Sequence, residues 1–472
     1  MLARTTAYLL LIFFLLPLPA GAQDKQPDWV RKTGARVFPA STRLFRVKAK
    51  PDTTIAATGA IQAALDLCAA KGGGIVVFDP GTYVTGALFI RSGVQLRIDK
   101  AVTLLGSQRF EDYPLMDTRI AGIEMKWPAA LINFIDVKNA ALTGEGTINA
   151  RGKFCWDKYW EMRRDYDARG LRWVVDYDAQ RVRTVLVQRS VDITLRGVRL
   201  KNAGFWTVQL LYSSHLTVGG LIIRNNEDGH GPSTDGVDVD SSSWVLIRDC
   251  DIDCNDDNFC LKAGRDRDGL RVNRPTEYVV IRNCLARRGA GLVTLGSETS
   301  GGIRHIFATD LKASHTDNGL RLKSATTRGG VIEDIYFQNS DLDSVKNVFQ
   351  YNLNWYPAYS YSTLPAGYTE STIPPHWKTL LQKVTPEEGT PFARGFYIRG
   401  IRASHAGNVF EAAGLPGSWL TRFVYTDCRI SAASPGTLEF TRDWQFNRCN
   451  FSVERPPEVK TKQNQAELER QQ

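Results

Sequence analysis

A short apolar motif recurs along most of this chain and limits what it can fold into. The segments ITLRGV, LTVGGL, VLIRDC and VVIRNC resemble one another, and successive copies start 21 to 34 residues apart, except for one longer interruption. Each unit combines short alternating strands with turns, and a period of this length indicates a solenoid of stacked units. Copies begin at Ile193, Leu216, Val245, Val279, Ile306, Ile335, Phe396, Phe423 and Trp444.

Two other classes of repeat protein do not match this pattern. Leucine-rich repeats need a Leu/Asn consensus with helical segments, and propeller blades need four strands in about 40 residues. We therefore predict an all-β fold, a right-handed parallel β-helix over residues 53–453, whose coils stack equivalent residues in ladders. One repeat position holds Cys250, Cys284, Cys428 and Cys449, so we expect stacked core thiols; the eight cysteines permit disulfides without selecting pairs.

A helical pattern precedes the repeats, from Thr53 to Ala70. Three glycines at positions 72–74 end it. A single amphipathic helix before a long β region needs a surface to cover, and we expect it to cap the exposed end of the stacked core. Its apolar stripe contains Ile55, Ile61, Ala64, Leu65 and Cys68.

Both ends of the chain differ from the repeats. Residues 1–22 combine Arg4, an apolar run and a small-residue cleavage pattern, so we expect a secretory signal and a mature protein that begins at Gln23. Residues 23–52 would be an N-terminal extension, and residues 454–472, rich in Gln, Glu and Lys, a disordered tail. No later run is apolar enough for a membrane span, which predicts an exported protein of the periplasm or the extracellular space.

The formal net charge of +9 suits an acidic partner, although a soluble basic surface explains it equally well. Export argues against nucleic acid as that partner and leaves acidic polysaccharide as the better candidate. We expect a monomer that uses no metal ion and no other cofactor.

Two segments interrupt the repeat, residues 155–177 and 345–392, and both are expected to form long loops over one side of the solenoid. Their aromatic side chains either stack on sugar rings or pack on one another, and the sequence does not choose between these alternatives. These aromatics include Trp156, Trp160, Trp173, Trp355, Tyr356, Tyr359, Tyr361 and Trp377.

Three carboxylates lie within one repeat step: Asp235, and Asp256 with its neighbour Asp257. Such acids serve as solvated turn residues, as calcium ligands or as acid/base groups. Stacking of adjacent coils would bring them together, and glycoside hydrolysis needs one protonated and one ionised carboxyl group. Like charges side by side raise one pKa and so keep a proton on one member. Neighbouring segments supply the positive charges of Lys262, Arg265, Arg321 and Lys323.

These residues resemble the motifs of the polygalacturonase family of glycoside hydrolases, family 28. The family has N-T-D-G, then D-D about 21 residues later, then G-H-G and R-I-K. This chain has STDG at 233–236, NDD at 255–257 and RLK at 321–323, with the same spacing of 21 residues between Asp235 and Asp256. The N-terminal part, through AIQAALDLCAAKGGGIVVF and GEGTINARG, resembles the family as well, so the likeness extends from about Thr53 to the end of the repeats.

The resemblance implies a role for each motif residue. Asp256 would be the general acid, and Asp235 with Asp257 would position and deprotonate the attacking water in an inverting hydrolysis. Arg321 and Lys323 would bind the carboxylate of a uronic acid, to which an Arg fork is suited. Lys262 is expected to balance the carboxylates rather than react.

The histidine of the family's G-H-G motif is missing, because the matching segment is Gly289-Ala290-Gly291. A literal Gly229-His230-Gly231 precedes Asp235, and we interpret His230 as a loop residue with a substrate contact as the alternative; His315 is a similarly weak candidate. Family members that act on rhamnogalacturonan also lack this histidine. Ala290 and the aromatic loops therefore leave two substrates open, a branched or mixed pectic chain and the end of short pectic oligosaccharides.

The predicted function is that of an exported inverting glycosidase acting on α-linkages of pectic poly- or oligosaccharides. One alternative is a pectate-lyase-like enzyme, which would eliminate rather than hydrolyse by means of calcium and a basic residue. The other is a pectin-binding β-helix without activity. Three intact acids favour the hydrolase.

Overall fold

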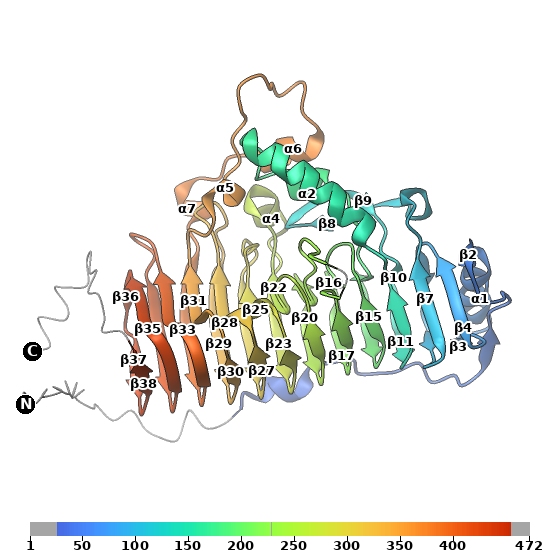
Figure 1. Cartoon of the computed structure of the whole chain (residues 1–472), viewed down its shortest axis with the longest axis horizontal. Coiled ribbons are helices and arrows are strands. Elements are labelled where there is room, and N and C mark those ends of the chain that lie inside the picture. The colour runs from blue at the N-terminus through green and yellow to red at the C-terminus, as the bar shows by residue number, and fades with distance from the viewer. Residues whose placement is uncertain (1–25, 228, 455–472) are drawn as a thin grey trace, which may run out of the picture.

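The computed structural model describes residues 26–227 and 229–454, and parallel strands dominate it (Figure 1). The predicted secretory signal and nearly all of the predicted disordered tail lie outside the described residues. Fourteen strands form one sheet: β1 (Leu44–Arg46), β3 (Gly74–Val77), β6 (Val94–Ile98), β11 (Lys138–Gly144), β14 (Val191–Arg196), β17 (Ser214–Gly219), β20 (Ser243–Arg248), β23 (Thr276–Arg282), β26 (Ile303–Thr309), β29 (Val331–Gln338), β32 (Phe392–Arg399), β34 (Leu420–Thr426), β36 (Thr441–Arg442) and β37 (Gln445–Asn447).

A second sheet of 22 strands completes the coils. It consists of β2 (Asp52–Ala56), β4 (Gly81–Thr85), β5 (Leu88–Ile90), β7 (Val102–Gly106), β10 (Ile132–Ile135), β12 (Thr147–Asn149), β13 (Val185–Gln188), β15 (Arg199–Lys201), β16 (Val208–Leu211), β18 (Ile222–Arg224), β19 (Val237–Asp240), β21 (Asp251–Asp253), β22 (Phe259–Lys262), β24 (Leu285–Ala286), β25 (Gly289–Leu295), β27 (Lys312–Ser314), β28 (Thr316–Lys323), β30 (Asp341–Asp343), β31 (Asn347–Asn352), β33 (Arg402–Ala413), β35 (Arg429–Glu439) and β38 (Asn450–Val453).

The register of the first sheet reproduces the repeat read from the sequence. The paired positions are Ile193, Leu216, Val245, Val279, Ile306, Ile335, Phe396 and Phe423, which are the predicted starts of eight copies. Trp444 continues the ladder, its ring stacked on Phe423 at 4.7 Å between centroids. These side chains point into a single apolar core. The predicted right-handed parallel β-helix is confirmed.

The motif also fixes the turn that follows each strand of the first sheet. Its fifth residue, Gly197 in ITLRGV, Asp249 in VLIRDC and Asn283 in VVIRNC, has a positive φ, between 51° and 82°. Gly, Asn and Asp adopt this left-handed conformation at least cost. The next residue then turns inward, which places Cys250 and Cys284 side by side.

The predicted thiol ladder is present. The backbone N–H of Cys250 lies 3.4 Å from the Sγ of Cys284, and the thiols of Cys250, Cys284, Cys428 and Cys449 each point to the carbonyl two residues earlier. All eight cysteines are free thiols in this structure. Burial explains their position in the core without a disulfide framework.

The capping helix is shorter than predicted. α1 runs from Thr58 to Ala70 and packs Ile61, Leu65 and Cys68 onto the end of the core, whereas residues 52–56 form β2 beside β4. Placing Ile55 on the helical stripe was wrong, because Ile55 is 70% exposed. The Asp52 carboxylate accepts hydrogen bonds from the backbone N–H groups of Thr54 and Ile55, and consecutive β-branched residues favour an extended chain.

Insertions gather on one side of the β-helix (Figure 1), as predicted, but much of what was expected to be loop is helical. Residues 153–168 form a helix with three i,i+4 ion pairs within it or at its C-terminal end, and the second interruption begins only after β31. We call residues 115–128, 153–178 and 354–389 the lid. The lid contains the antiparallel pair β8 (Leu115–Ile120) and β9 (Ile123–Pro128), and α2 (Lys153–Ala168), α3 (Val175–Asp178), α5 (Pro357–Ser360), α6 (Pro375–Leu380) and α7 (Pro386–Gly389).

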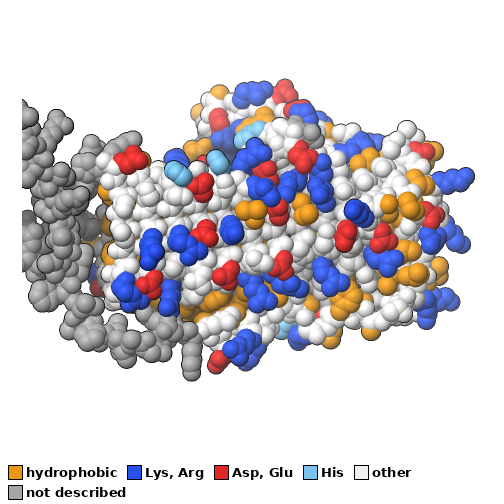
Figure 2. Space-filling model, turned by 60° about the horizontal axis from the view of Figure 1, so that its bottom comes forward, with side chains coloured by type: hydrophobic (Ala, Val, Ile, Leu, Met, Phe, Trp, Pro, Cys, Tyr) orange, Lys and Arg blue, Asp and Glu red, His pale blue; other side chains and the backbone are white. Residues whose placement is uncertain are grey.

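The remaining helices are short: η1 (Asp28–Lys32), η2 (Phe110–Asp112) and α4 (Asp266–Val272). Within residues 26–227 and 229–454, no helix has the length and apolar run that crossing a membrane requires. Basic and acidic side chains are interspersed over the face drawn in Figure 2. Charges of opposite sign also alternate along the ladder Glu277, Arg304, Glu333 and Arg394 on four neighbouring strands. The basic excess is therefore not one continuous patch on that face.

Candidate active site

The predicted acids and cations meet on the second sheet, under the lid. Strand register places Asp238, Cys260, Thr294 and Arg321 on one ladder across β19, β22, β25 and β28, and Asp240 beside Lys262 two residues further on. Asp235 and the Asp256-Asp257 pair lie in the turns just before β19 and β22. One carboxylate oxygen from each of these three acids lies within 4.8 Å of the others. Coil stacking therefore creates the cluster.

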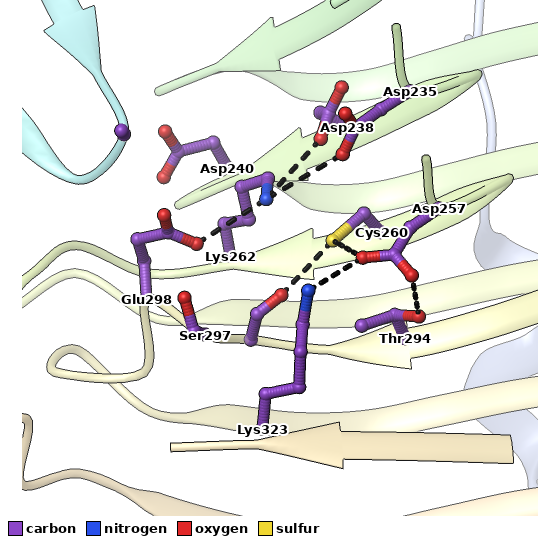
Figure 3. Close-up of polar contacts among 12 residues, drawn as sticks. Asp235, Asp238, Asp240, Asp257, Cys260, Lys262, Thr294, Ser297, Glu298 and Lys323 are labelled. Atoms are coloured by element: carbon purple, nitrogen blue, oxygen red, sulfur yellow. Dashed lines mark hydrogen bonds and ion pairs between the residues drawn. The ribbon is translucent and has the colours of Figure 1, made fainter. Parts of the chain in front are cut away.

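Asp257 is held as a carboxylate. Its Oδ1 accepts a hydrogen bond from Thr294 Oγ1 at 2.7 Å, and its Oδ2 accepts one from Lys323 Nζ at 2.7 Å (Figure 3). Oδ1 also accepts a hydrogen bond from Arg321 at 3.2 Å. Burial alone would raise the pKa of Asp257, but Lys323 and Arg321 outweigh burial and hold that pKa well below its usual range. Asp257 is thus ionised at neutral pH.

The pKa of its neighbour Asp256 is shifted in the opposite direction. Its pKa is raised by burial and then by the negative charge of Asp257, while Lys323 and Arg321 lower it only in part. The side chain is half-exposed, unlike those of Asp235 and Asp257. Its Oδ1 accepts the backbone N–H of Asp257 at 2.9 Å, which orients the carboxyl group. Asp256 is therefore the acid best suited to carry a proton to a bound molecule.

A second group of carboxyls surrounds Lys262. The Nζ atom lies 3.3 Å from Glu298 Oε2, 3.6 Å from Asp238 Oδ1 and 3.9 Å from Asp235 Oδ2 (Figure 3). Burial raises the pKa of both Asp235 and Asp238 well above the ordinary value; the negative charge of Asp238 adds to the rise for Asp235, and those of Glu298 and Asp257 add to it for Asp238. Lys262 thus lies among three carboxyl groups, and its role as their counter-charge stays a prediction.

Several members of this site were not predicted. Asp238 and Asp240 lie in the strand VDVD, and their outward-facing alternation was a usable signal. Asp240 pairs with the fully buried Arg119 of β8 at 2.9 Å. Glu298 lies in the loop after β25, so no strand register indicated that it would reach Lys262.

Two tryptophan rings lie against the basic side chains of the site. Trp355 lies 4.7 Å from Lys323 Nζ and 5.6 Å from the Arg321 guanidinium, and Trp206 lies 4.9 Å from Lys262 Nζ. Most lid aromatics instead pack on one another in a second core that contains Trp127, Trp173, Trp206 and Trp377. Packing of the lid aromatics on one another is thus observed, and stacking on sugar rings stays a prediction.

The weaker histidine candidates lie outside the cluster. His230 is exposed and stacks on Trp160, with ring centroids 5.3 Å apart. His315 is exposed and contacts Ser314. The backbone N–H of Ala290 donates to the carbonyl of Asp256 at 2.9 Å, so the position that holds the family histidine adjoins Asp256.

Two sets of side chains have the proximity of metal ligands among the described residues: Asp235, Asp238 and Cys260, and Asp235, Asp256 and Asp257. Both adjoin lysine ammonium groups, at 2.7 Å from Asp257 and 3.6 Å from Asp238. These cations repel a metal ion and already neutralise part of the acidic charge. The donor set therefore favours acid/base chemistry over cation binding.

Comparison with known proteins gives a consistent result. The family model described as "Glycosyl hydrolases family 28" matches residues 80–358. An exo-poly-alpha-D-galacturonosidase of Dickeya chrysanthemi is 26% identical over 459 residues, 89% of this chain and 72% of that protein. An endo-polygalacturonase of Pectobacterium parmentieri is 28% identical over 304 residues, 61% of this chain and 70% of that protein. The crystal structure of a Thermotoga maritima exopolygalacturonase has a TM-score of 0.74 at 22% identity and covers 90% of this chain and 94% of that one.

Proposed function

The chain belongs to glycosyl hydrolases family 28, and on this basis we propose that it hydrolyses α-glycosidic bonds of an acidic pectic poly- or oligosaccharide. One observation carries the proposal: three carboxylates converge within 4.8 Å, one of them paired with Arg321 and Lys323. Glycosidases need acids in different protonation states, and uronic acids need a cation. This site supplies both.

We assign the chemistry as follows. Asp256 donates its proton to the glycosidic oxygen, since its raised pKa favours the protonated form. Asp257, which is ionised, and Asp235 orient the attacking water and accept its proton. Arg321 and Lys323 hold the substrate carboxylate beside Asp257.

We propose inversion of the anomeric centre. Inverting enzymes usually separate their two carboxyl groups by about 6.5–9.5 Å to leave room for water. The acids here have oxygens within 4.8 Å, so the water would lie beside the cluster, with Asp235 and Asp257 on one side of it. Proton NMR of the first product anomer tests this directly: an α product from an α-linked substrate would contradict inversion.

We further propose attack at chain ends. The lid covers the cluster: Asp235 is 2% exposed and Asp257 fully buried, while Trp355 and Tyr359 of the lid contact site residues. Such a roof suits a chain terminus better than the interior of a polymer. The Dickeya relative, which aligns with 89% of this chain and is named an exo-poly-alpha-D-galacturonosidase, supports the same mode. Export to the periplasm or the extracellular space, where pectic polymers are met, remains part of this proposal.

Product analysis tests the proposal in one experiment. The protein is incubated with homogalacturonan and rhamnogalacturonan oligosaccharides of defined length, without added calcium. We expect saturated products shortened by one terminal unit at a time. An unsaturated product absorbing near 235 nm would identify a lyase instead, and oligosaccharide binding without turnover would identify a binding protein.

A further inference from the structure

A buried chain of polar groups connects the lid to the carboxylate cluster. The Tyr359 hydroxyl of α5 lies 3.3 Å from Glu298 Oε1, and Glu298 Oε2 lies 3.3 Å from Lys262 Nζ. Lys262 in turn faces Asp238 and Asp235, as Figure 3 shows. All five of these residues are at most 7% exposed. Their interactions are therefore little weakened by solvent.

One ammonium group faces three carboxyl groups in this chain. Its distances are 3.3 Å to Glu298, 3.6 Å to Asp238 and 3.9 Å to Asp235, so Glu298 holds the closest contact. Among the described residues, no hydrogen bond reaches Asp235 Oδ1 or either carboxylate oxygen of Asp238. A negative charge on Asp235 is thus stabilised mainly by the Lys262 ammonium group. Glu298, which lies closer to that group, weakens this stabilisation.

Other charged or titratable groups also face these residues. Lys323 and Arg328 attract Glu298, and Asp256 and Asp257 repel a charge on Asp235. The charged or titratable groups around the chain include Arg172, Asp176, Tyr177, Asp240, Cys254, Asp256, Asp257, Cys260, Arg265, Lys323 and Arg328. Lys262 is the nearest cation to Asp235, so a change in its position affects Asp235 first.

We propose that Glu298 is a positioning residue, which draws Lys262 away from Asp235 and thereby sets how readily Asp235 gives up its proton, while Tyr359 connects this setting to the lid. The inference rests on the proposed hydrolysis, in which Asp235 must be ionised to assist the attacking water. Burial favours the neutral form of Asp235, so the position of Lys262 decides the balance. A movement of the lid that displaces Tyr359 breaks its hydrogen bond to Glu298 and so changes how strongly Glu298 attracts Lys262.

The pKa directions agree with this arrangement. Burial raises the pKa of Asp235 and of Asp238, and burial would also raise that of Glu298, but Lys262 first, then Lys323 and Arg328, lower it. Glu298 is therefore the ionised partner of Lys262. Asp235 and Asp238 therefore face a Lys262 ammonium group whose positive charge Glu298 already partly neutralises.

The test is the pH dependence of kcat for Glu298→Gln. The isosteric change removes a negative charge and releases Lys262 toward Asp235, so Asp235 ionises at lower pH. We expect the acidic limb of the kcat profile to move down by about 0.5–1 pH unit, with KM changed less than about twofold. Glu298→Asp, which keeps the charge, should restore most of the wild-type profile. An unmoved limb in an active, folded Glu298→Gln protein would overturn the proposal.

Tyr359→Phe provides an independent check with the opposite sign. Loss of the hydroxyl leaves Glu298 more negative, so the limb should move up, by less than about 0.5 pH unit. Glu333→Gln, on the outer ladder beside Arg394, is the matched control and should leave the profile unchanged. If Glu298→Gln does not fold, an unmoved or lowered limb in Tyr359→Phe overturns the proposal.

A separate readout distinguishes this inference from the proposed function. Carbon-13 NMR of labelled aspartate carboxyls follows the titration of Asp235 without turnover. Absence of activity on every pectic substrate would reject the proposed function alone. An Asp235 titration that is the same in wild type and Glu298→Gln would reject the role of Glu298 alone.

Discussion

Asp256 and Asp257 are adjacent in the chain, yet their side chains have opposite electrostatic surroundings. Asp257 is fully buried and contacts Lys323, Arg321 and Thr294, whereas Asp256 is half-exposed with only partial compensation. The same neighbouring cations therefore lower the pKa of Asp257 well below its usual range but leave that of Asp256 raised, which is the kind of asymmetry that acid/base hydrolysis requires.

Asp256→Asn tests the acid role. The amide has nearly the same shape but cannot donate a proton to the glycosidic oxygen, so we expect kcat to fall by about 10²–10⁴-fold. Oligosaccharide affinity, measured by calorimetry, and the thermal unfolding midpoint should change little, because the side chain is half-exposed. Asp253→Asn, on the preceding strand β21 and paired with Arg288, is the control and should retain activity. Normal turnover in Asp256→Asn would contradict the assignment.

The sequence predicted six of the residues in this site, Lys262 among them, and missed others for a physical reason. Motif spacing indicated the three acids with Arg321 and Lys323, and stacking of coils brought them together. Glu298 is delivered by a loop without a register, so only three-dimensional packing relates it to Lys262. Local patterns carry no such information.

At the scale of elements, the repeat was predictable because every stacked coil needs the same kinds of residue at equivalent positions. An apolar residue must point inward and a Gly, Asn or Asp must turn the chain, and both demands are visible in the motif. The lid helices obey no such period. α2 gave a local signal, its i,i+4 charge pairs, which the three tryptophans nearby obscured.

The capping helix α1 offers a matched pair of substitutions. Leu65 is fully buried against the end of the core, and Leu67 is 49% exposed on the opposite face. Leu65→Ala should lower the free energy of unfolding by about 2–5 kcal/mol, because it leaves a cavity under the cap. Leu67→Ala should stay within about 0.5 kcal/mol of wild type. Equal effects in urea unfolding would show that α1 does not seal the core.

At the scale of the whole molecule, the lid joins segments that lie about 200 residues apart in the chain. Trp173 and Trp377 meet edge to face, with centroids 5.4 Å apart, and Asp178 accepts the indole N–H of Trp377 and contacts His376. The β-helix does not need these contacts for its own core, which is a separate cluster. The lid is therefore a unit that can loosen while the solenoid stays folded.

Trp377→Ala should loosen the lid and change the mode of cleavage. Removal of a buried Trp costs about 3–5 kcal/mol, here borne mainly by the second core, so the roof over the cluster opens more often. On long homogalacturonan, chromatography should then show mixed oligosaccharides in place of a single terminal product, while most of the circular dichroism signal of the strands persists. Trp419→Ala, near Phe440 and outside the lid, removes the same kind of side chain and should keep the wild-type products. If Trp377→Ala releases only the terminal unit at an unchanged rate, the lid does not determine where the substrate is cut.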